Sequence, residues 1–338
     1  MLDSVEINTR KGRRMLKKLV FLLVTMLIVA PLIILAGCSG GTLDLVAFVP
    51  QKANLVGEIN VSQILSDEDF ADIYDRLPKE NEDPQTLREA LDAFENDSDI
   101  DLRDFERGVF FSDTSVSVDD GGYFGVIIEG DFDREDLLNA LESSMGEELD
   151  VDEYKGYDIY SNEDETSAVA FLSPSVFVMG QISPVKDVIQ VKDGNREALG
   201  GDVIETYNEL GDALIKMVSL QAYLGEETLP DSLPGLPIDL SPFADIEKST
   251  LVLNKQGHTI SMETKLYFSN SESAESAENL VSFIELLVDM LPVPEEGQNL
   301  VAELLGKLDI ERDGSLLTIS FEITVSEIED IIESGNTA

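Results

Sequence analysis

The N-terminal region constrains this chain more than any other part of the sequence. An uncharged, strongly apolar run extends from Leu19 to Gly37, and small residues end it. Six basic residues come shortly before the run: Arg10, Lys11, Arg13, Arg14, Lys17 and Lys18. A basic segment, an apolar segment and small residues, in this order, are typical of a secretory signal peptide. The basic flank predicts that the N-terminus stays inside and that the rest of the chain lies outside the cytoplasm.

A short motif ends the apolar run. It consists of Leu35, Ala36, Gly37 and Cys38, and Cys38 is the only cysteine of the chain. The motif resembles the lipobox of prokaryotic lipoproteins. The resemblance implies that the Cys38 thiol receives a diacylglyceryl group and that lipoprotein signal peptidase cuts before Cys38. Residues 1–37 would then be the signal peptide and residues 38–42 a lipidated tether, anchoring the protein to the outer face of the cell membrane.

Two other interpretations of the leader stay open. The apolar run is about long enough for a plain transmembrane anchor, which needs about 20 residues. Pro31 and the small residues before Cys38 argue against that anchor. Arg13 and Arg14 suggest a twin-arginine export signal, but the residues that follow match it loosely, so we expect general secretion.

The charge of the chain restricts its partners. The formal net charge is -45, from 68 acidic and 23 basic residues. The leader contains six of the basic residues and two of the acidic ones, which leaves 66 acidic and 17 basic residues and a net charge of -49 after it. Such a body repels the phosphates of nucleic acids. The acidity fits either a solvated, salt-adapted surface or attraction of divalent cations or a basic partner.

The rare residue types exclude several kinds of site. A single cysteine excludes an internal disulfide framework and a thiolate-rich metal site. A single histidine, His258, argues against a Ser-His-Asp hydrolase and a multi-histidine metal site. His258 follows Gly257 between two expected strands, which indicates a hairpin turn. We expect no cofactor.

After the leader, short apolar strands come in consecutive pairs separated by turns, with amphipathic helices between the pairs. This order favours an α+β fold in which each mainly antiparallel sheet has helices on one face. We expect a capping box at Thr324 and Glu327 to start the last helix. The expected strands cover residues 43–49, 55–61, 109–111, 123–129, 157–160, 168–172, 176–180, 250–254, 259–268 and 316–323.

Two sequence patterns recur in the same order. The apolar spacing around residues 55–65 returns at residues 214–224, and the Ile-Asp-Leu motif at Ile100 returns at Ile238. These echoes predict an internal duplication, with one α+β module at residues 43–200 and a homologous one at residues 201–338. The alternative is two unrelated α+β halves. The arrangement resembles uncharacterised prokaryotic lipoproteins with duplicated modules, a resemblance that implies no known activity.

One acidic segment has the spacing of a cation site. Asp97, Asp99 and Asp101 match the first, third and fifth positions of an EF-hand calcium loop. However, Leu102 stands where that loop needs glycine, and Gly108 stands where it needs a bidentate glutamate. The three aspartates are therefore weak metal candidates, and a turn or cap role for Asp101 is favoured.

These observations lead to one functional expectation and two alternatives. We expect a lipid-anchored, non-enzymatic protein that binds or scaffolds an envelope partner. The first alternative is the solute-binding lipoprotein of a transporter, which would need a cleft between two lobes. The second is an envelope hydrolase that uses paired carboxylates, which would need a buried pair with a raised pKa in a cleft.

Overall fold

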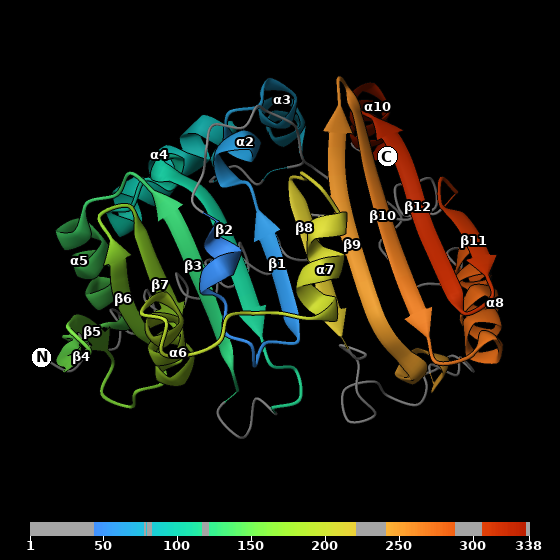
Figure 1. Ribbon diagram of the computed structural model, residues 1–338. Helices are drawn as coiled ribbons and strands as arrows, with labels where there is room; N and C mark the ends of the chain where they lie inside the picture. The colour runs from blue at the N-terminus through green and yellow to red at the C-terminus, as the bar shows by residue number, and fades with distance from the viewer. Residues whose placement is uncertain are drawn as a thin grey trace, which may run out of the picture.

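The computed structural model describes residues 44–77, 79, 83–116, 122–220, 241–287 and 306–335. Their main feature is one twelve-stranded sheet in which every neighbouring pair of strands is antiparallel (Figure 1). The strand order is β11-β12-β10-β9-β8-β1-β2-β3-β7-β6-β5-β4. The predicted α+β class with antiparallel strands is confirmed.

The strands match most of the predicted ranges, and three strands are added: β8 at the middle of the sheet, and β4 and β11 at its ends. The strands are β1 (Leu55–Ile59), β2 (Phe105–Ser112), β3 (Phe124–Gly130), β4 (Asp150–Tyr154), β5 (Tyr157–Ser161), β6 (Ala168–Ser173), β7 (Val176–Gly180), β8 (Ile215–Leu220), β9 (Ile246–Gln256), β10 (Thr259–Phe268), β11 (Asp309–Asp313) and β12 (Leu316–Thr324).

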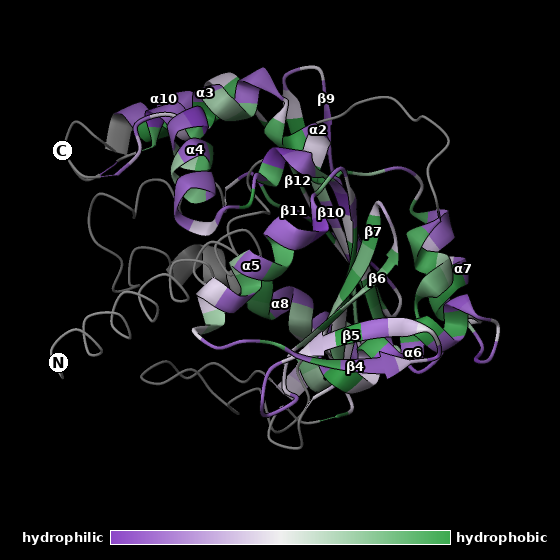
Figure 2. Cartoon of the chain, turned by 90° about the vertical axis from the view of Figure 1, so that its left-hand side faces the viewer, coloured by the Kyte–Doolittle hydropathy of each residue, from purple (hydrophilic) through white to green (hydrophobic). Residues whose placement is uncertain are grey.

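Helices cover both faces of the sheet, so the prediction of helices on one face was wrong. Figure 2 views the sheet nearly edge-on, with α4, α5 and α8 on one side and α6 and α7 on the other. The helices are α2 (Val61–Leu65), α3 (Glu68–Arg76), α4 (Leu87–Ser98), α5 (Arg134–Met145), α6 (Ile182–Lys192), α7 (Asp202–Glu209), α8 (Ser271–Leu287) and α10 (Val325–Gly335), with 3-10 turns η2 (Leu45–Phe48), η3 (Leu102–Asp104) and η5 (Ser241–Asp245).

Strand β7 shows why two helical layers are needed. Val176 and Val178 pack into one core with α6 and η2, while Phe177 between them packs into a second core with α5. Successive side chains of a strand point to opposite faces. A strand that is apolar at every position must be covered on both sides, because either bare face would expose hydrophobic surface to water.

The two halves of the chain meet at the middle of the sheet. β1 and β8 pair along their length, from Leu55 opposite Ser219 to Ile59 opposite Ile215. The pairing continues past the strands, because the Asn60 side-chain amide donates to the Ala213 carbonyl at 2.6 Å. Strands from before and after residue 200 therefore belong to one continuous sheet.

The first described segment is a 3-10 turn, so the predicted strand at residues 43–49 was wrong. Leu45 and Val46 of η2 and Val49 after it are buried in the core beside α6. Short apolar runs are compatible with either a strand or a helical turn. The run pairs with no strand of the sheet and is secured instead by a single bridge from Pro50 to Ala198.

The capping box that begins α10 is confirmed. The Thr324 hydroxyl accepts from the Glu327 backbone N–H, and the Glu327 carboxylate accepts from the Thr324 backbone N–H at 2.7 Å. Lys307 donates to the same carboxylate at 2.7 Å. The hydrogen bond from Lys307, followed by those from Thr324, lowers the pKa of Glu327 to about 2.

We expect Glu327→Gln to flatten the acid dependence of stability. The folded pKa lies below the ordinary value of 4.5, so ionised Glu327 stabilises the fold above that pH. This contribution is lost as the pH falls from about 4.5 to about 2. Urea unfolding at a series of pH values measures it. Lys307→Met, which removes the main donor, should act in the same direction, and an unchanged profile in both variants would contradict the assignment.

Candidate functional site

The proposed lipid-attachment motif lies outside the described residues, as do the signal peptide and the tether. The first described residue, Asp44, comes six positions after Cys38, and Leu45 is fully buried.

The three aspartates of the calcium hypothesis have three separate local roles. Asp97 lies in the last turn of α4. Asp99 ends this helix in the left-handed conformation, with φ 59°. Asp101 begins η3, where its carboxylate accepts from the Arg103 backbone N–H at 2.9 Å. The predicted turn or cap role of Asp101 is confirmed.

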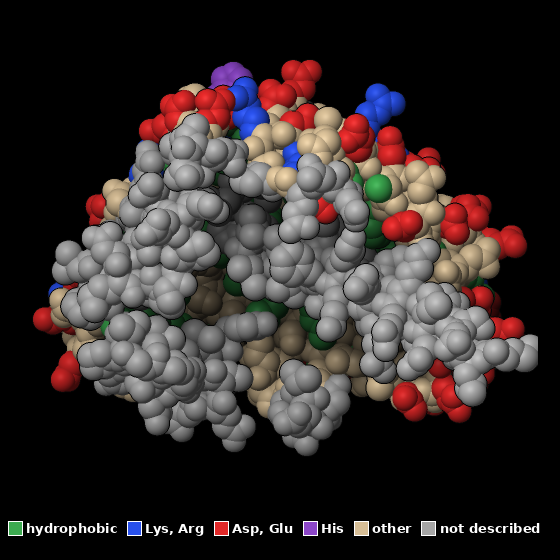
Figure 3. Space-filling view, turned by 180° about the vertical axis from the view of Figure 1, so that it is seen from behind, with side chains coloured by type: hydrophobic (Ala, Val, Ile, Leu, Met, Phe, Trp, Pro, Cys, Tyr) green, Lys and Arg blue, Asp and Glu red, His purple; other side chains and the backbone are tan. Residues whose placement is uncertain are grey.

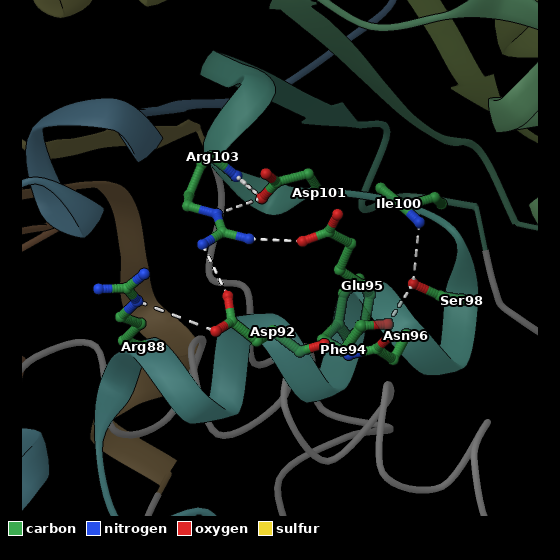
Figure 4. A network of polar contacts seen from close by, with 9 residues as sticks. All are labelled: Arg88, Asp92, Phe94, Glu95, Asn96, Ser98, Ile100, Asp101 and Arg103. Atoms are coloured by element: carbon green, nitrogen blue, oxygen red, sulfur yellow. Dashed lines mark hydrogen bonds and ion pairs between the residues drawn. The ribbon is translucent and has the colours of Figure 1, made fainter.

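Arg103 binds only the third of these aspartates, together with two acidic residues of α4 (Figure 4). Its guanidinium donates to Asp101 at 2.6 Å, to Asp92 at 2.8 Å and to Glu95 at 2.5 Å. Burial opposes ionisation of Asp101, but its hydrogen bonds from Arg103 lower its pKa below the usual range. In the described part of the chain, no three His, Cys, Asp or Glu side chains gather as metal ligands. The hydrogen bonds of Arg103 therefore connect η3 to α4.

His258 lies in the β9–β10 hairpin turn, as predicted, after Gly257 with φ 62°. Its Nδ1 lies 2.8 Å from Oδ2 of Asp69, at the start of α3. Buried Lys255 contacts the same carboxylate. Burial opposes ionisation, but the hydrogen bonds from Lys255 and His258 lower the pKa of Asp69. The histidine thus connects the second half of the chain to a helix of the first half.

The sequence did not predict a cluster of charges buried at the middle of the sheet. Arg107 on β2 donates to Glu129 on β3 at 2.8 Å and lies 3.4 Å from Glu58 on β1. The side chains of Arg107, Glu58 and Glu129 are only 12%, 12% and 10% exposed. Lys216 on β8 lies 3.6 Å from Glu58. The cluster thus contains two carboxylates and two cations from four adjacent strands, and their charges neutralise one another.

Tyr207 of α7 covers this cluster. Its hydroxyl donates to the Glu58 carboxylate, and the Lys216 ammonium lies 4.2 Å from the ring centroid. Burial and the neighbouring Glu58 charge raise the pKa of Tyr207 well above its usual range. The hydroxyl therefore keeps its proton and acts as a donor. The arrangement holds α7 against the junction of β1 and β8.

A second buried carboxylate, that of Asp187, also binds a tyrosine hydroxyl and a basic side chain. Asp187 of α6 accepts from the Tyr123 hydroxyl at 2.8 Å and pairs with Arg196. Burial raises the pKa of Tyr123 to about 12. Glu58 lies under α7 and Asp187 belongs to α6, and each binds basic and hydroxyl partners, which is an arrangement that stabilises helix packing.

Two open hollows lie on the surface of the described residues. One, of about 580 Å³, lies over β9, β10 and β12 and is lined by Val252, Ser261, Glu263, Ser320 and Glu322 among others. The other, of about 510 Å³, lies between α5 and the β4–β5 hairpin. Figure 3 shows that acidic side chains greatly outnumber basic ones on the visible described surface of the rear face.

Within the described residues, the structure contains no helix that is both long and apolar enough to span a bilayer.

Comparison with known proteins identifies structural similarity only. No protein-family model matches the chain, and no curated protein matches it. Crystal forms I, III and IV of TP0453 resemble it with TM-scores of 0.44, 0.47 and 0.44 and identities of 11%, 12% and 13%. Each match covers 87% of this chain and 98%, 100% and 99% of the respective TP0453 chain. The matches assign neither a family nor an activity to this chain.

Proposed function

We propose that this chain is a lipid-anchored, extracytoplasmic lipoprotein whose role is to bind or scaffold an envelope partner without catalysing a reaction. The observation that carries the proposal is the position of the only cysteine. Cys38 ends a lipobox-like motif behind an apolar run, and buried Leu45 follows seven residues later.

The short connection has a mechanical consequence. A fully extended chain advances about 3.5 Å per residue, so the six steps from Cys38 to Asp44 reach about 20 Å. A lipid on Cys38 would therefore hold η2 and the neighbouring face of the sheet close to the membrane. A partner bound elsewhere on the body would be recruited to the membrane surface.

The arrangement of the buried charges supports a binding role over the hydrolase alternative. Glu58 and Glu129 share Arg107, and Tyr207 covers Glu58. Hydrolysis by a carboxylate pair needs one acid held protonated beside the substrate. The solute-binding alternative is less favoured because β1 and β8 join the two halves as neighbouring strands of one sheet.

We further propose that residues 43–200 and 201–338 are two copies of one module. On either side of the β1–β8 junction the strands follow in corresponding order: β1-β2-β3-β7-β6 and β8-β9-β10-β12-β11. A long helix comes after the third strand of each series, α5 in one and α8 in the other. The hairpin of β4 and β5 would then be an addition to the first copy.

Mass spectrometry of the mature N-terminus tests the anchoring. We expect the chain purified from membranes to begin at Cys38 and to carry the mass of a diacylglyceryl group. An unmodified Cys38 on an uncut chain would overturn the proposal. Crosslinking the membrane-bound protein to its neighbours before purification tests the binding role, and we expect a specific envelope protein to be captured.

A further inference from the structure

Strand β4 ends the sheet with an open edge. In the described part of the chain it pairs with β5 alone, and it lies at the opposite end of the sheet from β11 (Figure 1). Its outer backbone N–H and C=O groups are therefore available to another strand. Four of its five residues are exposed.

An apolar position stands out on this edge. Val151 is 57% exposed and is one of two large hydrophobic side chains exposed in the described residues. It lies opposite Tyr160 of β5, which packs into the core with α5. Successive strand residues point to opposite faces. Val151 therefore points to the face of the sheet that α5 covers.

The hollow of about 510 Å³ lies beside Val151. Leu138, Leu149, Val151 and Tyr160 provide its apolar walls. The loop after α5 forms part of the wall of the hollow. The Leu149 backbone N–H in this loop donates to the Glu142 carboxylate of α5 at 3.0 Å. A strand added to β4 would place alternate side chains on the α5 side, at the opening of this hollow.

The polar groups around the edge are mostly acidic. Arg134 is already engaged with Asp158 and with the Tyr160 hydroxyl, and Lys155 lies beyond the end of the strand. The acids of the edge and the hollow are Asp133, Glu135, Glu142, Asp150, Asp152 and Glu153. Pairing with β4 of a second copy would bring like charges together, which is unfavourable. The charge therefore favours a basic occupant.

We propose that the open edge of β4 and the adjacent hollow bind an extended, basic peptide segment of a partner protein by strand addition. The backbone of the segment would pair with β4, as in other cases of β-augmentation. Its basic side chains would lie beside Asp150 and Asp152, and an apolar side chain on the other face would contact Val151 and Leu138. This inference rests on the proposed binding role and specifies the class of partner.

Binding of a synthetic peptide to the full chain in detergent tests the inference. The probe is a fluorescent heptapeptide of alternating lysine and valine, and its Kd is measured by anisotropy. Because each surface ion pair contributes modestly, we expect D150K/D152K to raise the Kd about tenfold. The matched control is D309K/E311K, which makes the same charge change on the other edge strand, β11, and should leave the Kd unchanged.

Two further results decide between the proposed contact and general charge attraction. N-methylation of alternate peptide amides should abolish binding, because it removes the donors needed for strand pairing. Val151→Thr, at an exposed position, should raise the Kd about threefold because it replaces an apolar contact. Equal weakening by the two charge variants, or full binding of the N-methylated peptide, would overturn the inference. So would sedimentation of the protein as a dimer formed through β4.

The test is independent of lipid anchoring. A Cys38→Ser chain should bind the peptide with the wild-type Kd. Loss of anchoring with retained peptide binding would contradict only the lipoprotein assignment, whereas normal anchoring without peptide binding would contradict only the strand-addition site.

Discussion

Replacement of Cys38 by alanine is expected to abolish lipid attachment and signal-peptide cleavage together. The thiol is the only group at this position that can accept the diacylglyceryl chain. Two buried acyl chains contribute more than about 10 kcal/mol to membrane binding, at about 0.8 kcal/mol per methylene. We therefore expect the lipid mass to disappear and the chain to keep residues 1–37. Metabolic labelling with a fatty-acid analogue and mass spectrometry of the N-terminus measure both effects.

The same variant distinguishes the remaining interpretations of the leader. If the apolar run from Leu19 to Gly37 were a permanent transmembrane anchor, the wild-type protein would also be uncut and unlabelled. As a control, Arg13→Lys combined with Arg14→Lys keeps the basic charge and removes the paired arginines. We expect normal export of this control. Blocked export would indicate the twin-arginine route, and unaltered lipid labelling of Cys38→Ala would contradict the assignment of the lipid to Cys38.

Arg107→Met is expected to produce the largest loss of stability among the charge substitutions. Removing the guanidinium leaves Glu58 and Glu129 at the middle of the sheet without the cation between them. Breaking a buried ion pair on one side costs about 3–5 kcal/mol. Because both carboxylates are about nine-tenths buried, water cannot replace the lost partner fully. Urea unfolding followed by circular dichroism measures the change.

Arg103→Met provides the matched control. Arg103 also contacts acidic side chains, but its network is exposed: Arg103 is 37% accessible, and Asp92 and Glu95 are more so. Exposed ion pairs contribute about 0–1 kcal/mol each, so this variant should lose much less stability. Glu129→Gln in the Arg107→Met background should recover part of the loss. Equal destabilisation by the two arginine substitutions would contradict a special role for the buried cluster.

Local patterns predicted nine of the twelve strands. The ranges 176–180 and 259–268 agree with β7 and β10 residue for residue, and Thr324 and Glu327 form the predicted capping box. The patterns missed three strands: β8 at the middle of the sheet, and β4 and β11 at its ends. The two end strands consist largely of charged residues. Edge strands commonly carry charge because it discourages aggregation, and this charge removes the hydrophobic alternation that identifies a strand.

Sequence patterns likewise predicted some features of the candidate sites and missed others. The spacing of Asp97, Asp99 and Asp101 resembled a calcium loop, and Leu102 and Gly108 already indicated the departure from it. The contacts of Arg103 with Asp92, Glu95 and Asp101 were not predicted. The buried cluster of Glu58, Arg107 and Glu129 could have been suspected only from charged residues within apolar strands. Their pairing joins three strands, which a linear pattern does not reveal.

The amino-acid sequence alone indicated the features that depend on neighbouring residues: the predicted export leader, the lipobox-like motif at Cys38, the helix cap and most strands. Tertiary structure decided the features that depend on residues far apart. The pairing of β1 with β8, the helices on both faces and the open edge of β4 are of this kind. The physical reason is that strand pairing and burial depend on which surfaces meet, and many pairings satisfy the same alternation of apolar residues.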